Sequence, residues 1–221
     1  MSESTVLVIE DGNEYLNVLT RFVSGYKYLQ AHDGQTALTF LEQGAAALIY
    51  LDMRFDRTPR HLLLGDHGQQ TAKFGGDTER AWQFLEKNQT RFLDELCDFI
   101  RIPSVSADPN HKDDVSFASR WVAERLKSAG AENVAVMPTE GHPCVYGDWR
   151  HAAENQPTIL IYGHFDVQPA DPYELWTTSP FSPDIRDEKI FGRGASDERG
   201  GVLIPILSFE AMMKTEGKLP I

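Results

Sequence analysis

The fold of this chain is decided by residues 158–201, which read TILIYGHFDVQPADPYELWTTSPFSPDIRDEKIFGRGASDERGG. The stretch opens on an apolar run at residues 158–162, which predicts a buried strand ending at a glycine. His164 and Asp166 follow this strand. Residues two apart on an extended chain face the same side, so we expect these two side chains to lie together. Ligand sites of open α/β sheets gather at the carboxyl ends of strands, where this pair falls.

A second acidic position follows in the same stretch. The glycine-rich turn at residues 192–196 suits close backbone approach, and Asp197 comes directly after it. Imidazole and carboxylate are ordinary zinc ligands, and a ligating histidine usually needs a carboxylate behind it to fix its ring. Spacing alone leaves open whether Asp166 or Asp197 binds metal while the other orients His164. A strand-end histidine and a turn carboxylate without any metal are the plainer alternative.

The order and spacing of several segments resemble one enzyme family. GHFDVQP (163–169), WTTSPFSP (176–183) and GRGASDERGG (192–201) are similar to the first half of a zinc metallopeptidase of the aminoacylase, acetylornithine deacetylase and carnosine-dipeptidase family. Upstream, FLDELCDFIRIPSVSAD (92–108) resembles the usual opening of that family. The resemblance covers about residues 84–221 and therefore extends over the second part of the chain.

The resemblance implies a role for each matching residue. It makes His164 a ligand of one metal ion, Asp197 the carboxylate that bridges two metal ions, and Asp166 the catalytic-site residue that orients His164. It further implies two zinc ions and hydrolysis of an amide bond in a small peptide or N-acyl amino acid substrate. The expected activity is that of a metal-dependent hydrolase of the dipeptidase type.

The end of the chain limits this expectation. By resemblance, the general base is a glutamate of a Glu-Glu pair that follows a strand starting near Leu219, and these 221 residues do not contain that pair. Glu210 in a predicted helix and Glu216 in a predicted loop are not convincing substitutes. Glu198-Arg199 also departs mildly from the family pattern, which has an acidic residue and then lysine. We expect this chain alone to hold half an active site and to be inactive.

The first part of the chain alternates between strand and helix patterns. Apolar runs at residues 5–9, 26–31 and 47–51 predict strands, and amphipathic segments near 15–23 and 34–42 predict helices between them. This βαβαβ order is typical of a parallel, doubly wound sheet. The expected fold class is α/β. A parallel-type sheet with flanking helices in the peptidase-like part is preceded by a truncated, flavodoxin-like βαβαβ segment.

Residues 6–56 resemble a response-regulator receiver domain. Glu10, Asp11 and Asp52 fall where that family keeps a magnesium-binding acidic pair and a phospho-acceptor aspartate. Clustered carboxylates suit a hard cation such as magnesium, although acids in solvent at strand ends would give the same pattern. A receiver needs two more strands, and no strand-like run appears before the helix beginning near Thr78. A phosphorylation-dependent signalling or binding protein acting through Asp52 is the alternative function.

Composition limits the partners of the protein. The formal net charge is −12, which argues against a nucleic-acid partner. No apolar run reaches the length of a membrane span, and the start lacks the basic region of a signal peptide, so we expect a cytoplasmic protein without membrane contact. Cys97 and Cys144 are expected to be reduced, buried thiols. The exact substrate and the oligomeric state stay open, with a homo-oligomer among the alternatives.

These patterns predict two segments, at residues 1–82 and 83–221, joined where neither looks whole. The first resembles part of a receiver, and the second resembles the N-terminal part of a peptidase catalytic domain. A natural fusion, an engineered chimera and a truncated gene product would all give this pattern.

Overall fold

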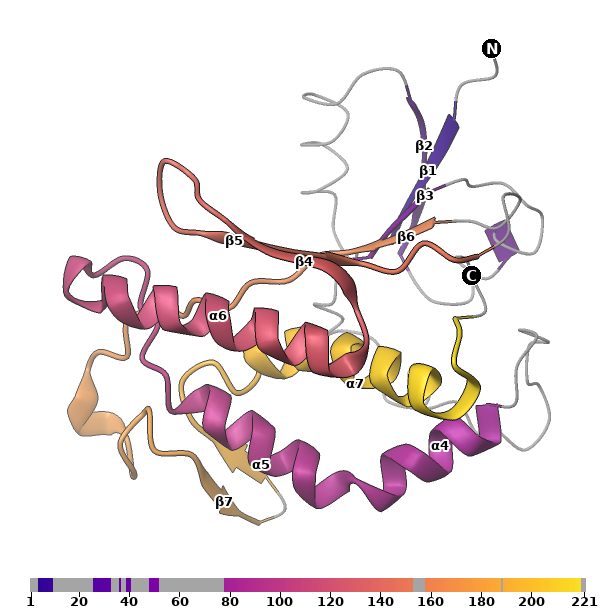
Figure 1. The fold of residues 1–221 in the computed structure, drawn as a ribbon. Coiled ribbons are helices and arrows are strands. Elements are labelled where there is room, and N and C mark those ends of the chain that lie inside the picture. Colours follow the sequence, from indigo (N-terminus) through magenta and orange to yellow (C-terminus); the bar gives the residue numbers. More distant parts are fainter. Residues whose placement is uncertain are drawn as a thin grey trace. The chain divides into compact units, whose positions relative to one another are not determined.

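The computed structural model describes residues 4–9, 26–32, 36, 39–40, 48–51, 78–152, 158–187 and 189–219 (Figure 1). The chain divides into two compact units, each built from separate parts of the sequence. The first unit comprises Met1–Gly76, Ala152–Gly163 and Pro220–Ile221, and the second comprises Asp77–His151 and His164–Leu219. The apolar run at residues 158–162 therefore belongs to the first unit, whereas His164 and Asp166, which follow it, belong to the second.

The first unit contains a four-stranded parallel sheet in the order β2-β1-β3-β6. Its strands are β1 (Ser4–Ile9), β2 (Tyr26–Ala31), β3 (Leu48–Leu51) and β6 (Thr158–Ile161). The first three lie close to the apolar runs that predicted them. The helices expected between them fall largely outside the described residues, so the flavodoxin-like assignment stays a prediction.

Strand β6 pairs in register with β3, from Leu48↔Thr158 to Leu51↔Ile161. The prediction of a strand here is confirmed, but the prediction that it is buried is wrong. Leu160 and Ile161 are 48% and 47% exposed. In the described sheet β6 is an edge strand, with a hydrogen-bonded neighbour on one side only. The apolar residues of β6 therefore predicted the strand correctly, but its side chains are not covered by other elements to the extent that a buried strand requires.

The second unit is built from helices and two antiparallel strand pairs (Figure 1). Helix α7 packs against α4, α5 and α6, and α6 packs against β4 and β5. The helices are α4 (Thr78–Lys87), α5 (Gln89–Ile100), α6 (Lys112–Ala129) and α7 (Arg199–Glu216), with short 3₁₀ helices η1 (Pro109–His111) and η2 (Tyr173–Leu175). The strands are β4 (Glu132–Met137) with β5 (Cys144–Asp148), and β7 (Asp184–Arg186) with β8 (Lys189–Phe191).

Helix ends in this unit follow the local sequence. Asn88 separates α4 from α5, and its side-chain amide donates to the Phe84 carbonyl at 2.7 Å. Gly130 ends α6 in the left-handed conformation, with φ of +106°, which glycine adopts without steric cost. Gly217 ends α7 in the same way, so Glu216 is the last residue of a helix and not part of a loop as the sequence suggested.

The core of this unit lies where α5, α6 and α7 meet. Phe99 stacks on Trp121 with ring centroids 4.3 Å apart, and Phe99 is fully buried. Offset stacking of this kind adds to the gain from burying apolar area. The buried core cluster also contains small and aliphatic side chains from α6, α7 and the α5–η1 loop: Ile102, Ala118, Val122, Ala129 and Ile206.

A closed ring of ion pairs joins the same three helices. Arg125 donates to Glu95 at 2.7 Å and to Glu210, and Arg91 donates to Glu95 at 2.5 Å and to Glu210 at 3.1 Å. Glu210 is only 6% exposed, so its charge depends on these two guanidinium groups. Both of its oxygens are engaged in structural contacts, which agrees with the expectation that it does not act as a general base.

The two cysteines differ in burial. Both are free thiols, but Cys97 is buried in α5 while Cys144 is exposed at the start of β5. The prediction of two reduced thiols agrees with this, whereas the expectation that Cys144 is buried is wrong because the β4–β5 pair exposes much of its surface. In the described parts of the chain, every helix is too short or too polar to cross a lipid bilayer.

Candidate metal site

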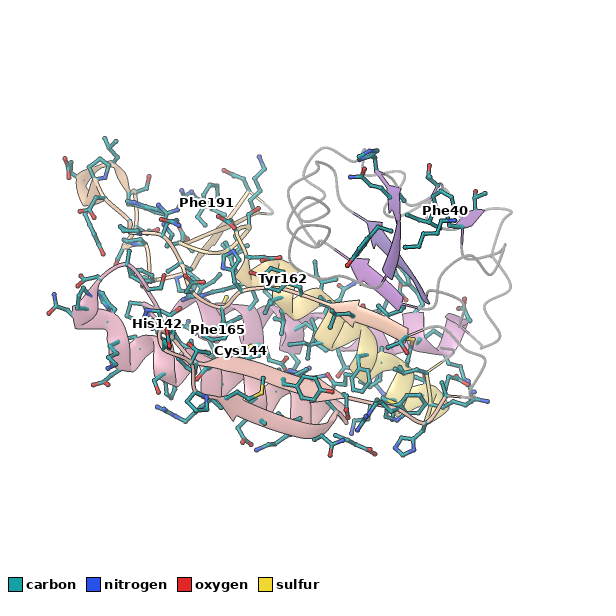
Figure 2. The ribbon with its side chains drawn as sticks, turned by 90° about the horizontal axis from the view of Figure 1, so that it is seen from above. Phe40, His142, Cys144, Tyr162, Phe165 and Phe191 are labelled. Carbon is teal, nitrogen blue, oxygen red and sulfur yellow. The ribbon has the colours of Figure 1, made fainter. Side chains whose placement is uncertain are left out.

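The residues predicted to form a site come together within the second unit. His164 and Asp166 follow β6 in the chain, and the imidazole Nδ1 of His164 lies 3.0 Å from Oδ1 of Asp166. On the other side of the ring, Nε2 lies 3.4 Å from Oδ1 of Asp197. Phe165, which lies between His164 and Asp166 in the sequence, packs against the core cluster instead (Figure 2). The alternation expected of an extended chain therefore separates two polar side chains from one apolar side chain.

The glycine-rich turn brings Asp197 to this point. Gly194 has φ of +86°, and a Cβ there would lie 2.6 Å from Cγ1 of Val167. A Cβ on Gly192 would lie 2.7 Å from Cγ2 of Ile100. Both positions require the absence of a side chain, since such contacts would displace packed neighbours. The close backbone approach predicted for this turn is therefore confirmed.

Glu198 is a site residue that the sequence reasoning missed. It is 3% exposed, and its Oε2 accepts a hydrogen bond from the backbone N–H of His164 at 3.2 Å. The same oxygen lies 3.4 Å from the His164 Nε2. The resemblance does imply an acidic residue directly after Asp197, which could have marked Glu198 as a site residue. Only the folded chain shows that its carboxylate contacts His164.

Ser106 is the second residue that was missed. Its hydroxyl donates to Oδ2 of Asp166, on the opposite side of the carboxylate from His164. Ser106 lies 60 residues earlier in the chain, within the segment that resembles the opening of the family. No local pattern marks a serine in a loop as a partner for a distant carboxylate, and the contact depends on tertiary structure.

The close contact between His164 and Asp166 changes how both titrate. The hydrogen bond that the His164 ring donates to the Asp166 carboxylate is the main cause that raises the pKa of His164 from 6.5 to about 9, against the effect of burial, and Glu198 adds to the rise. The hydrogen bond from His164 is likewise the main cause that lowers the pKa of Asp166 from 3.8 to about 2, with Ser106 contributing. In the metal-free chain at neutral pH these two groups therefore form an ion pair, and a metal ion that binds the imidazole must release its proton.

We expect the imidazole of His164 in the metal-free chain to titrate near pH 9, as measured by NMR of its ring protons. The raised pKa stabilises the fold below pH 6.5, and this contribution is lost as the pH rises through 9. Asp166→Asn should bring the pKa back toward 6.5, because it removes the carboxylate that favours the charged ring. An unchanged titration in Asp166→Asn would contradict this account of the pair.

The donor set fits a metal ion only in part. His164 Nε2 and Asp197 Oδ1 converge, and Asp197 is 69% exposed at its side chain, so it is accessible to a second ion. Imidazole nitrogen and carboxylate oxygen are common zinc donors, but a catalytic zinc site needs three protein ligands. Across residues 78–152, 158–187, 189–219 and the described strands, no group of three or more His, Cys, Asp or Glu is arranged to hold a metal ion. The described residues provide part of a site.

One surface feature lies beside helix α6, and three predicted residues fall outside the described part of the chain. A groove of about 460 Å³ runs between α6 and the β4–β5 pair, lined by residues such as Arg120, Lys127 and Val136, and the site residues His164, Asp166 and Asp197 are not part of its lining. Glu10, Asp11 and Asp52, predicted to bind magnesium and accept phosphate, lie outside the described residues.

Comparison with known proteins supports the family resemblance. Residues 160–221 match the peptidase family M20/M25/M40. The chain is 32% identical over 133 residues to the cysteinylglycine-S-conjugate dipeptidase of Corynebacterium striatum, which covers 60% of this chain and 29% of the relative. It is 30% identical over 143 residues to the Cys-Gly metallodipeptidase dug1 of Schizosaccharomyces pombe, covering 60% of this chain and 30% of the relative.

A solved structure shows the same likeness in three dimensions. The crystal structure of human carnosine dipeptidase 1 matches with a TM-score of 0.60 and 29% identity, over 66% of this chain and 33% of that protein. The chain thus spans 29–33% of the length of these relatives. The relatives are dipeptidases, and the matched part of this chain contains the residues that converge at His164.

Proposed function

We propose that this chain supplies the first part of a two-zinc active site in a metal-dependent hydrolase that cleaves amide bonds of small peptides. The observation that carries the proposal is the convergence of His164, Asp166 and Asp197 within the second unit. All three lie in the segment that matches the peptidase family M20/M25/M40. Charge agrees with this class of function, since a formal net charge of −12 argues against a nucleic-acid partner.

Each residue has a distinct role in the proposed site. His164 presents Nε2 as a donor, and Asp166 holds the opposite ring nitrogen, Nδ1, at 3.0 Å so that the ring keeps one orientation. Asp197 presents an exposed carboxylate that two ions can share. When bound, two zinc ions polarise a substrate carbonyl and make a bound water more acidic. His164, Asp166 and Asp197 hold donors in place, and the resemblance gives the role of general base to a different residue, a glutamate.

A dipeptide is the proposed substrate class, with N-acyl amino acids as the related wider class. Similar proteins are a cysteinylglycine-S-conjugate dipeptidase and a Cys-Gly metallodipeptidase, and each is about three times as long as the matched region. By resemblance the general base is a glutamate of a Glu-Glu pair that follows a strand starting near Leu219. Both oxygens of Glu210 accept from arginine side chains, and Glu216 pairs with Arg80 through one oxygen at the end of α7.

One observation favours the signalling alternative. Strand β1 pairs in parallel with β3 so that Ile9 lies opposite Leu51, and Glu10 and Asp52 are the residues that come directly after these strands in the sequence. The acids of the receiver-like segment therefore follow positions paired in the sheet. The likeness to dipeptidases extends over a longer stretch and carries named motifs, so we place the hydrolase first and the signalling protein second.

Metal preference separates the two functions. The 221-residue chain should bind zinc, as followed by competition with a chromophoric chelator, because imidazole and carboxylate converge at His164. It should not take up a phosphoryl group from acetyl phosphate with magnesium, since the strands that carry the receiver's hydroxyl and lysine residues are not recognisable in the sequence. Stoichiometric, magnesium-dependent phosphorylation that disappears in Asp52→Asn, together with no zinc binding, would reverse the order of the two proposals.

A further inference from the structure

We propose that Ser106 is a positioning residue of the metal site, acting on His164 through Asp166. Ser106 lies in the loop between α5 and η1, 58 positions before His164 in the chain, and the sequence assigns it no role. The expected effect of Ser106 on metal binding rests on the proposed function. The hydrogen bonds that support the positioning role are present without a metal ion.

Two hydrogen bonds fix the carboxylate of Asp166 from both sides. Ser106 Oγ donates to Oδ2, and the imidazole Nδ1 of His164 lies 3.0 Å from Oδ1. A carboxylate held by one oxygen alone can rotate about its terminal torsion, which is broad in energy. With both oxygens engaged, that rotation would break one contact. The hydroxyl of Ser106 therefore helps to set the direction in which His164 Nε2 faces Asp197.

The loop that carries Ser106 is aligned with the chain around Asp166. Val105 and Val167 form an isolated parallel bridge, and the N–H of Val167 donates to the Ser104 carbonyl at 3.0 Å. The Ser104 hydroxyl donates to the carbonyl of Phe165 at 2.7 Å. These contacts lie beside Ser106 in one segment and beside Asp166 in the other. The backbone around both residues is therefore fixed, and this fixed backbone places the Ser106 hydroxyl next to Asp166.

Helix α7 and the β4–β5 connection hold the same loop from other directions. Arg199, which is fully buried, donates to the Ser104 hydroxyl at 2.8 Å and to the Ile100 carbonyl at 2.7 Å. The Nε2 of His142 lies 3.0 Å from the carbonyl oxygen of Ser106. Arg199 follows Glu198, which accepts from the backbone of His164. The loop, the turn and the histidine therefore form one connected arrangement.

Zinc affinity and a metal-free measurement test this role in the 221-residue chain. Ser106→Ala should weaken zinc binding about 10-fold, the lower end of what loss of an outer hydrogen-bond partner costs a metal site. Ser106→Thr keeps a hydroxyl and should retain the affinity. Ser119→Ala is the matched control, because Ser119 is buried and its hydroxyl donates to the Ser116 carbonyl inside α6. It should leave zinc affinity unchanged.

Proton NMR of the metal-free chain provides the second readout. The Nδ1 proton of His164 should be observable and protected from exchange in the unchanged chain and in Ser106→Thr, and broadened in Ser106→Ala. Equal zinc affinity and equal proton protection in Ser106→Ala and the unchanged chain would overturn the positioning role. If the unchanged chain binds no zinc, the proposed function fails, and the proton resonance alone then decides whether Ser106 orders the pair.

Discussion

Arg199→Ala should lower the free energy of unfolding of this chain by about 3 kcal/mol, because it leaves several buried acceptors without a donor. The guanidinium is fully buried and donates to the carbonyls of Ile100 and Ile102 and to the hydroxyl of Ser104. A buried acceptor that loses its partner costs about 1–3 kcal/mol, and losses at neighbouring groups do not simply add. A cation is also favoured at this place, since the last carbonyls of α5 carry the negative end of the helix dipole.

Burial lowers the pKa of Arg199 to about 10, so the group stays charged at neutral pH. Its charge is therefore held by carbonyl and hydroxyl oxygens and by the face of Phe99, 5.2 Å from the guanidinium carbon. The family pattern has lysine at this position. Arg199→Lys keeps the charge but not the planar fork of donors, so it should destabilise the chain less than Arg199→Ala does.

Denaturant unfolding followed by tryptophan fluorescence measures both variants, since Trp121 stacks on Phe99 in the affected core. Arg120→Ala is the matched control, because that guanidinium lies on the exposed side of α6 and donates to Ser116. Surface substitutions of this kind usually change stability by less than about 0.5 kcal/mol. An Arg199→Ala variant as stable as Arg120→Ala would mean that the contacts of Arg199 do not hold α5 and α7 together.

The second expected result is that the 221-residue chain hydrolyses no dipeptide at a measurable rate, with or without added zinc. Removing a general base typically lowers the rate by about 10²–10⁴-fold, and among the described residues no group of three or more His, Cys, Asp or Glu is arranged to hold a metal ion. Such losses within one catalytic unit are not additive, but each acts in the same direction. Glu210 cannot compensate, since both of its oxygens accept from arginine side chains in the buried ion-pair ring.

The assay uses Cys-Gly and β-Ala-His with zinc added, and compares the unchanged chain with His164→Ala and Glu210→Gln. All three should be equally inactive. Zinc-dependent turnover that disappears in His164→Ala would show that a carboxylate in this chain acts as the base. Disappearance in Glu210→Gln as well would identify that carboxylate, provided that the variant unfolds at the same denaturant concentration as the unchanged chain.

The elements that the sequence predicts well are those with strong local signals. Strands β1, β2 and β3 lie close to the apolar runs at residues 5–9, 26–31 and 47–51 that predicted them. The convergence of His164 with Asp197 could also be predicted, because a strand end and a glycine turn both constrain the backbone. These predictions need no knowledge of distant packing.

The contacts that the sequence did not reveal connect residues far apart in the chain. Ser106 meets Asp166 across 60 residues, and Arg125 meets Glu210 across 85 residues. Neither serine nor arginine shows in its local pattern which distant partner it will find. The exposure of β6 was missed for a related reason, since apolar composition predicts a strand but not which layers cover it.

The most direct test of the central claim is a calorimetric zinc titration of the metal-free chain, of His164→Ala, and of His111→Ala. His111 is a matched control, because its Nδ1 also lies against a carboxylate, 2.7 Å from Asp114, whereas in the part of the chain that the structure describes no second carboxylate pairs with its ring as Asp197 does with His164. We predict zinc binding of micromolar or weaker affinity that His164→Ala reduces and His111→Ala leaves unchanged. Tight binding of two zinc ions, or equal binding by all three proteins, would contradict a partial metal site at His164.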